Sequence, residues 1–141
     1  MKNTTPYLHF DGQAEEAMTF YKTVFGGDFA IAQRYKDTPG GEKVSPGDKE
    51  KFIHITLRIN DQMALMATDL LSTMGTVRVG NNVHICVHTD SEQETEKVFD
   101  KLSKGGQVFM PLNKTFWGAY FGMCADQFGV QWMIEYSQMP S

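Results

Sequence analysis

The four histidines of this 141-residue chain are well suited to chemistry, because an imidazole exchanges protons near neutral pH and binds metal ions. His84 and His88 flank Cys86 at alternate positions, whereas His9 and His54 stand in separate apolar runs. Alternate side chains of a strand share one face, so His84, Cys86 and His88 are expected on the same side. A Cys–His pair could supply a nucleophile. Side chains two apart run parallel rather than converge, so an inert Cys86 is the favoured interpretation.

The surroundings of these residues form a weak internal repeat. A spacing of 79 residues separates matching positions of the two halves, from a strand through a helix to a Gly-Gly stop. The matching pairs are His9 and His88, Asp11 and Asp90, Phe20 and Phe99, Lys22 and Lys101, and Gly26-Gly27 and Gly105-Gly106.

Each half is predicted to fold as β-α-β-β-β. Period-2 and helical apolar spacing predict strands at 7–10, 29–35, 51–59 and 62–68 with a helix at 13–25. The second half has strands at 83–89, 107–111, 119–125 and 130–136, and Ser91 with Glu94 forms a capping box for its helix. The fold class is therefore α+β, one domain over 1–141 with modules at about 1–69 and 81–138 and a connector at 70–80. The polar, Gly- and Pro-rich residues 37–50 are expected to be a mobile loop, with a lid as the alternative.

Strand alternation predicts which side chains point away from the helices. Those of the early strands are Tyr7, His9, Phe52, His54, Thr56, Arg58, His84, Cys86 and His88. Arg58 could hold a carboxylate or phosphate through two parallel hydrogen bonds, or be a surface arginine. His54 or His88 could act as a general base, although the sequence shows no orienting partner for either.

Aromatic and thioether side chains could complete a pocket. Phe116, Trp117 and Phe121 could stack on a planar ligand, with core packing as the alternative. Met66 and Met133 could line an adaptable wall.

Composition narrows the possible functions. The chain has 13 basic and 17 acidic residues and a net charge of -4, and this balance argues against nucleic-acid binding. No apolar run approaches the roughly 18 residues of a membrane helix. Residues 1–6 lack the apolar core of a signal peptide and the chain has two cysteines, so a reduced, cytoplasmic protein is expected.

The chain resembles the vicinal oxygen chelate superfamily, which includes glyoxalase I, extradiol dioxygenases and bleomycin-binding proteins, and within it the PhnB-like branch. The motifs are PYLHFDG at 6–12, AEEA at 14–17, TFWG at 115–118 and DQFGVQWMI at 126–134. The resemblance implies a curved mixed sheet around a cleft with helices outside, a small-molecule ligand and a homodimer. The candidate ligand-binding residues are then Tyr7, His9, His54, Arg58, Met66, His84, Cys86, His88, Trp117, Phe121 and Met133.

The resemblance also implies where a divalent ion would bind in metal-dependent relatives. Those positions map to Thr5, Met66, His84 and Met133. Only His84 is a good ligand for such an ion, so no metal cofactor is expected. A rearranged site drawing on His9, His84 and His88, or on His54, is the alternative, with Glu135 as the nearest carboxylate. Alternation does not determine which way Glu135 faces.

Some relatives carry the label of ubiquinone-pathway methyltransferases. A methyl-donor site would favour a glycine-rich turn between a strand and a helix. Gly26-Gly27 and Gly105-Gly106 instead follow predicted helices, where they serve as stops.

The expected function is that of a PhnB-like small-molecule enzyme without the standard metal site, with no residue assigned as catalytic. Two alternatives stay open: a non-catalytic sequestering protein of the bleomycin-resistance type, and a metal-dependent lyase or isomerase with a rearranged histidine site.

Overall fold

The structure, a computed structural model, describes residues 1–138 and divides into two compact units, Met1–Arg78 and Val79–Ser141. These units are called module one and module two below. Each contains one α-helix and one four-stranded mixed sheet, in the order β-α-β-β-β. The predicted α+β class with tandem βαβββ modules is confirmed.

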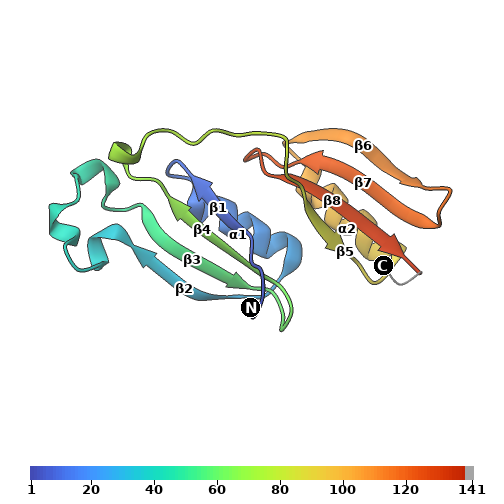
Figure 1. The fold of residues 1–141 in the computed structure, drawn as a ribbon, viewed down its shortest axis with the longest axis horizontal. Helices are drawn as coiled ribbons and strands as arrows, with labels where there is room; N and C mark the ends of the chain where they lie inside the picture. The colour runs from blue at the N-terminus through green and yellow to red at the C-terminus, as the bar shows by residue number, and fades with distance from the viewer. Residues whose placement is uncertain (139–141) are drawn as a thin grey trace. The chain divides into compact units, whose positions relative to one another are not determined.

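Module one has its strands in the spatial order β1-β4-β3-β2, with β1 parallel to β4 and the other pairs antiparallel (Figure 1). Its elements are β1 (Tyr7–Phe10), α1 (Ala14–Phe25), β2 (Asp28–Arg34), β3 (Phe52–Arg58) and β4 (Ala64–Asp69). Short 3₁₀ helices occupy Tyr35–Asp37, Gly41–Lys43, Pro46–Asp48 and Ser72–Met74.

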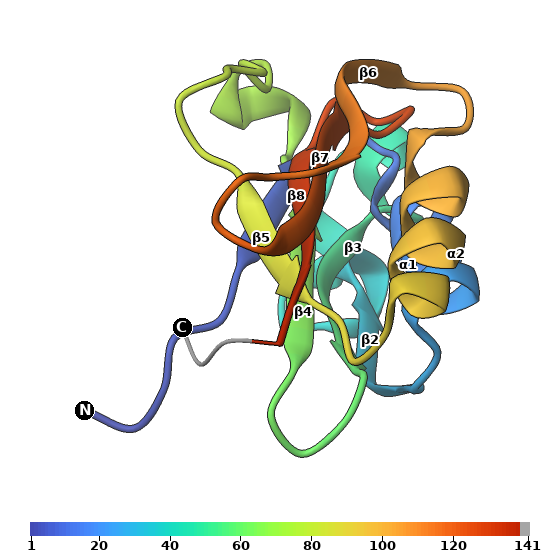
Figure 2. The same cartoon turned by 90° about the vertical axis from the view of Figure 1, so that its right-hand side faces the viewer.

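Module two repeats this plan as β5-β8-β7-β6, with β5 parallel to β8. Its elements are β5 (Ile85–His88), α2 (Glu92–Ser103), β6 (Gln107–Lys114), β7 (Ala119–Ala125) and β8 (Gln131–Ser137). Figure 2 shows α2 lying against one face of this sheet.

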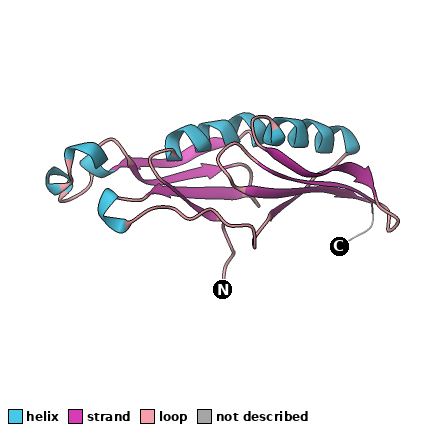
Figure 3. Cartoon of the chain, turned by 90° about the horizontal axis from the view of Figure 1, so that it is seen from above, coloured by secondary structure: helices cyan, strands magenta, loops and turns pink. Residues whose placement is uncertain are grey.

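In each module the helix covers one face of the sheet (Figure 3). The buried side chains of α1 recur at helical spacing and include Ala17, Met18 and Tyr21, and those of α2 include Phe99 and Leu102. Burying this stripe stabilises the helix more than its intrinsic propensity does. The opposite face of each sheet is therefore the one that can carry polar side chains.

The predicted Ser91 cap at the start of α2 is present, and the reciprocal bond to Glu94 comes from Asp90, the residue before the N-cap. Ser91 Oγ accepts a hydrogen bond from the Glu94 amide at 3.0 Å, and a Glu94 carboxylate oxygen accepts one from the Asp90 amide at 2.9 Å. These bonds satisfy backbone donors that have no partner inside the helix.

Two strands of module two differ from their predicted bounds. β6 continues past Pro111 to Lys114, because its pairing with β7 resumes at Asn113 opposite Phe121 after a register shift. Proline is tolerated there because β6 is an edge strand. β5 begins at Ile85 rather than at residue 83.

The side chain of Phe52 does not point away from the helix, although strand alternation predicted that it would. It lines a small hollow with Glu15 and Thr19 of α1, and the Arg34 guanidinium lies 4.3 Å from its ring centroid. A register shift between Gln33 and Arg34 of β2 interrupts the alternation at this point.

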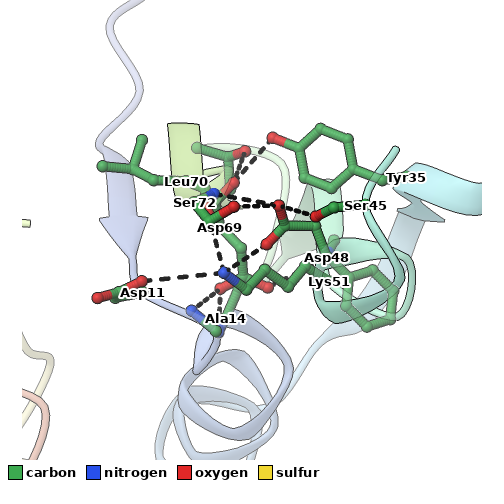
Figure 4. Close-up of polar contacts among 12 residues, drawn as sticks. Asp11, Ala14, Tyr35, Ser45, Asp48, Lys51, Asp69, Leu70 and Ser72 are labelled. Carbon is green, nitrogen blue, oxygen red and sulfur yellow. Dashed lines mark hydrogen bonds and ion pairs between the residues drawn. The ribbon is translucent and has the colours of Figure 1, made fainter. Parts of the chain in front are cut away.

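Residues 37–50 are tied to the rest of module one through Asp48 (Figure 4). The Asp48 side chain lies 2.9 Å from Lys51 Nζ and accepts hydrogen bonds from the hydroxyls of Ser45 and Ser72 at 2.9 and 2.7 Å. The contacts with Lys51 and Ser72 hold the pKa of Asp48 well below its usual range. The 3₁₀ helix that ends at Asp48 is thereby joined to the segment after β4.

Asp69 forms a second buried junction in module one (Figure 4). One carboxylate oxygen accepts hydrogen bonds from the amides of Gly12 and Ala14 at 3.0 and 2.9 Å, and the other accepts one from the Phe52 amide at 3.0 Å. The Tyr35 hydroxyl donates to the Asp69 carbonyl at 2.8 Å. One side chain at the end of β4 therefore fixes the start of α1 and the start of β3.

Among residues 1–138, no helix is both long enough and apolar enough to cross a membrane.

Candidate functional site

The two modules place polar side chains at matching register positions of their parallel strand pairs. In module one Tyr7 lies opposite Met66, and His9 lies opposite Thr68. In module two Cys86 lies opposite Met133, and His88 lies opposite Glu135. Neighbours in register share a sheet face. The matching positions thus carry different groups in the two modules. Module one has a tyrosine, a histidine and a threonine, whereas module two has a cysteine, a histidine and a glutamate.

The module-one face carries a series of hydrogen bonds centred on His54. Tyr7 Oη lies 2.9 Å from His54 Nδ1, and His54 Nε2 lies 2.7 Å from Thr56 Oγ1. The Tyr7 ring is also 5.5 Å from the His9 ring, centroid to centroid. His54, for which the sequence showed no orienting partner, is therefore held at both ring nitrogens.

Tyr7 is a proton donor rather than a phenolate at neutral pH. Burial raises its pKa, Tyr35 adds to this effect, and a hydrogen bond with Thr68 opposes it. When the Tyr7 hydroxyl donates to Nδ1, His54 carries its own proton on Nε2 and donates it to Thr56. This arrangement can pass a proton between the phenol and the imidazole.

Arg58 and Met66 lie on the same face of module one but outside this series. Arg58 is exposed near the end of β3, where it pairs in register with Asp28. Met66 is half-buried between Tyr7 on β1 and Thr56 on β3.

The module-two face brings Cys86 and His88 together with Glu135. One donor atom from each of the three residues lies within 4.8 Å of the others. Cys86 and His88 are exposed, and Glu135 is half-buried. Burial raises the pKa of the Cys86 thiol and the charge of Glu135 adds to it, so the thiol is protonated at neutral pH and is a weak nucleophile.

The other predicted residues of module two are spread over its sheet and turns. Phe121 lies opposite Glu135 on the neighbouring strand, and Met133 lies opposite Met123. Trp117 stands in the turn between β6 and β7, where its ring meets Phe116 edge-on at 4.9 Å. The structure does not gather Trp117 with Cys86 and His88.

His84 precedes β5 and is half-buried. Its Nε2 atom is buried and has no hydrogen-bond partner within the described part of the chain.

The positions at which the resemblance implies a metal ion do not fit one. Met66 and Met133 occupy the two strand positions and offer only thioethers, and Thr5 offers a hydroxyl. A hard or borderline divalent ion binds such donors poorly, which leaves His84 as the single good ligand in that set.

The chain itself engages one amide in the first turn of each helix. Asp69 accepts from the amides of Gly12 and Ala14 at the start of α1, and Ser91 accepts from the Glu94 amide at the start of α2. Helix N-termini are common binding sites for phosphates and other anions. Here one amide in the first turn of each helix has an internal partner.

Hollows within the modules involve other residues. An open hollow of about 520 Å³ in module two is lined by Gln107 and Phe109 of β6, Gln131 of β8 and residues 79–81. None of the predicted ligand-binding residues lines it.

Sequence reasoning missed one member of the polar faces and left the facing of another open. Thr68 is the register partner of His9, and Glu135 is that of His88. The facing of Glu135 depends on where β8 begins, which alternation alone did not determine.

Known structures show the fold of the chain. A glyoxylase/bleomycin resistance protein/dioxygenase domain from Frankia sp. EAN1pec matches this chain with a TM-score of 0.69, at 9% identity and over 98% of each chain. At that identity the match shows the fold alone, which is glyoxalase-like.

The family within that fold class follows from closer matches. A family model described as 3-demethylubiquinone-9 3-methyltransferase matches residues 2–135, and the chain belongs to this family. Protein PA1353 from Pseudomonas aeruginosa is 36% identical, over 99% of this chain and 100% of its own, with a TM-score of 0.85. A PhnB protein from Bacillus cereus is 30% identical, over 96% of this chain and 100% of its own, with a TM-score of 0.77. The predicted PhnB-like branch is thereby confirmed.

Proposed function

We propose that this protein binds a small organic molecule on the module-one face and acts on it by acid–base chemistry, in which His54 accepts a proton from the ligand and Tyr7 donates a hydrogen bond to the ligand oxygen. The observation that carries the proposal is the series from Tyr7 Oη through both His54 ring nitrogens to Thr56 Oγ1. An imidazole held at both nitrogens keeps one orientation and one tautomer, and a general base requires both.

The ligand would present a carbonyl or hydroxyl oxygen to Tyr7. Such an oxygen would replace His54 as the acceptor of the Tyr7 hydroxyl, and His54 Nδ1, 2.9 Å from Tyr7 Oη, would then be available to accept a proton from the ligand. Tyr7 supplies the complementary hydrogen bond because its raised pKa keeps it protonated. Positioned acid–base pairs of this kind contribute rate factors of about 10²–10⁴.

Methyl transfer, which the family description names, is not part of this proposal. A nucleotide-type methyl donor would favour free amides at a helix start beside a glycine-rich turn. The amides of Gly12, Ala14 and Glu94 are bonded to Asp69 and Ser91 instead.

The experiment has two stages and uses untagged protein. Native mass spectrometry first reads any mass that co-purifies with the chain. Small carbonyl and hydroxy compounds, with any molecule so identified, are then titrated into wild type, Tyr7→Phe and His54→Gln while imidazole resonances are followed by NMR. Tyr120→Phe is the matched control, because that hydroxyl bonds Glu96 in module two.

The expected result is binding that shifts the His54 resonances and weakens on the order of tenfold in Tyr7→Phe, the size of one lost hydrogen bond. Turnover would fall by about 10²–10⁴ in His54→Gln. Binding without product in wild type would favour the sequestering alternative. Binding that Tyr7→Phe and Tyr120→Phe affect equally would contradict the proposal.

We also propose that the protein is a cytoplasmic homodimer. Apolar side chains exposed on the edge strands support association; Ile31 of β2 and Val108 and Phe109 of β6 are 44–49% exposed. Two unpaired cysteines, Cys86 and Cys124, are consistent with a reducing compartment. Sedimentation equilibrium of untagged protein tests the dimer, and a monomer at micromolar concentration would contradict it.

A further inference from the structure

Module two holds a set of metal-ligating side chains that the proposed function does not use. Cys86 and His88 project from β5 at alternate positions, and Glu135 projects from the adjacent strand β8 in register with His88. Their donor atoms, one per residue, all lie within 4.8 Å of one another. We propose that Cys86, His88 and Glu135 form a binding site for a single divalent transition-metal ion of the Zn²⁺ type.

The chemistry of the donors selects this class of ion. Thiolate, imidazole and carboxylate are the three side-chain groups that bind Zn²⁺, whereas Mg²⁺ and Ca²⁺ prefer sites made of oxygen atoms. Bonds of about 2.0–2.3 Å in tetrahedral geometry bring donor atoms to roughly 3.5 Å from one another. Rotamer changes of the three side chains would have to close the site from the observed spacing to this one.

The number of ligands and their exposure would leave the bound ion accessible to water and small molecules. Three protein ligands leave a fourth tetrahedral position for water or a small molecule, as in catalytic rather than structural zinc sites. Cys86 and His88 are exposed and Glu135 is half-buried, so this position faces outward from the β5–β8 pair.

This site differs from the one that the family resemblance implies. That set would use the positions of His84 and Met133 in module two, whereas Cys86 and Glu135 each stand two residues further along the same strands. Cys86 lies in register with Met133, so the proposed site is next to the methionine that occupies one of the metal positions implied by the resemblance.

The internal repeat supplies a built-in comparison. The positions of module one that match Cys86 and His88 carry Tyr7 and His9, and Thr68 stands in register with His9 as Glu135 does with His88. A phenol and a threonine hydroxyl are poor ligands for Zn²⁺. The proposal therefore predicts one ion per chain, held by module two.

The test uses the full, untagged chain, freed of metal with a chelator and dialysed, and then titrated with Zn²⁺ or Co²⁺. Calorimetry gives the stoichiometry and affinity for Zn²⁺, and the near-ultraviolet thiolate-to-Co²⁺ charge-transfer band reports a cysteine ligand. The variants are Cys86→Ser, His88→Ala and Glu135→Gln. The matched controls are His9→Ala at the repeat position in module one and Cys124→Ser, which removes the buried thiol.

Wild type is expected to bind one ion per chain and to show the charge-transfer band. Cys86→Ser should abolish the band. His88→Ala and Glu135→Gln should weaken binding by at least roughly tenfold, since even the loss of an outer-shell partner costs about 10–100-fold. The controls should bind as wild type does.

Absence of binding by wild type would overturn the proposal. So would one bound ion that survives all three substitutions, because the ion would then be held elsewhere, and so would equal losses in the His9→Ala and Cys124→Ser controls. Circular dichroism checks folding of each variant, and Glu135→Gln, nearly isosteric, serves if Cys86→Ser fails to fold. The site is independent of the proton-transfer proposal for module one, so either can fail alone.

Discussion

Replacing Asp69 by Asn tests whether one buried carboxylate organises module one. The carboxylate accepts hydrogen bonds from the amides of Gly12, Ala14 and Phe52. The carbonyl oxygen of asparagine can still accept the hydrogen bonds from Gly12 and Ala14. Its NH₂ group then faces the Phe52 amide, and two donors cannot form a hydrogen bond with each other. The start of β3 should therefore lose its contact with the end of β4.

The magnitude follows from the bonds lost. A hydrogen bond to a charged group contributes about 1.5–3 kcal/mol, and a buried donor without a partner costs about 1–3 kcal/mol. Asp69→Asn loses one such bond and weakens two others, so we expect a destabilisation of roughly 2–4 kcal/mol. That is a large fraction of the 5–15 kcal/mol typical of a folded domain.

Urea denaturation followed by circular dichroism measures this change, with Asp61→Asn in an exposed turn as the control. A surface substitution of that kind should stay within about 0.5 kcal/mol of wild type. Native-state hydrogen exchange adds a local readout, because the Phe52 amide should lose protection. Equal stability of Asp69→Asn and Asp61→Asn would refute the reasoning.

Three further changes probe other parts of the fold. Asp48→Asn should remove part of the acid sensitivity of the protein's stability. The pKa of Asp48 is lowered in the folded state, so the stability it contributes is present above the pKa of an unfolded aspartate, about 3.9, and is lost as the pH falls below that value. Urea titrations of wild type and variant at pH 3 and pH 7 would measure this difference. Ser91→Ala should cost about 1 kcal/mol through loss of the α2 cap, measured by urea denaturation; an unchanged midpoint would contradict the cap assignment. Gly27→Ala should lower the melting temperature far more than Gly26→Ala. Both glycines have positive φ, but a Cβ at Gly27 would lie 2.3 Å from the Arg58 carbonyl oxygen, whereas one at Gly26 would meet no atom within 4 Å. Equal melting temperatures of the two variants would argue against that close approach.

Local patterns were enough to predict the elements. Helical spacing of apolar residues located α1, and the Ser91–Glu94 pair located the start of α2, because both signals lie within a few neighbouring residues. Alternation placed His54 and Cys86 on the faces opposite the helices in the same way.

Contacts between distant residues were beyond those patterns. The 3₁₀ helices within 37–50 are joined to the module through Asp48 and Ser72, which are far apart in the sequence, and no periodicity marks such a pair. The juxtaposition of Cys86 with Glu135 depends on the register of β5 against β8, and a shift of one residue would turn Glu135 to the helix side. Tyr7, one of the two hydroxyl partners of His54, likewise comes from another strand of the sheet, β1.

The matching registers of the two parallel strand pairs suggest how such a chain could diversify after duplication of an ancestral half. Each half keeps its own helix and sheet, so the outward positions on one half can change without altering the same positions on the other. Tyr7 and Cys86 mark such a divergence, with a phenol on one copy and a thiol at the matching position of the other. The same correspondence guides protein engineering, since Tyr7→Cys combined with Thr68→Glu would copy the donor set of one half onto the other.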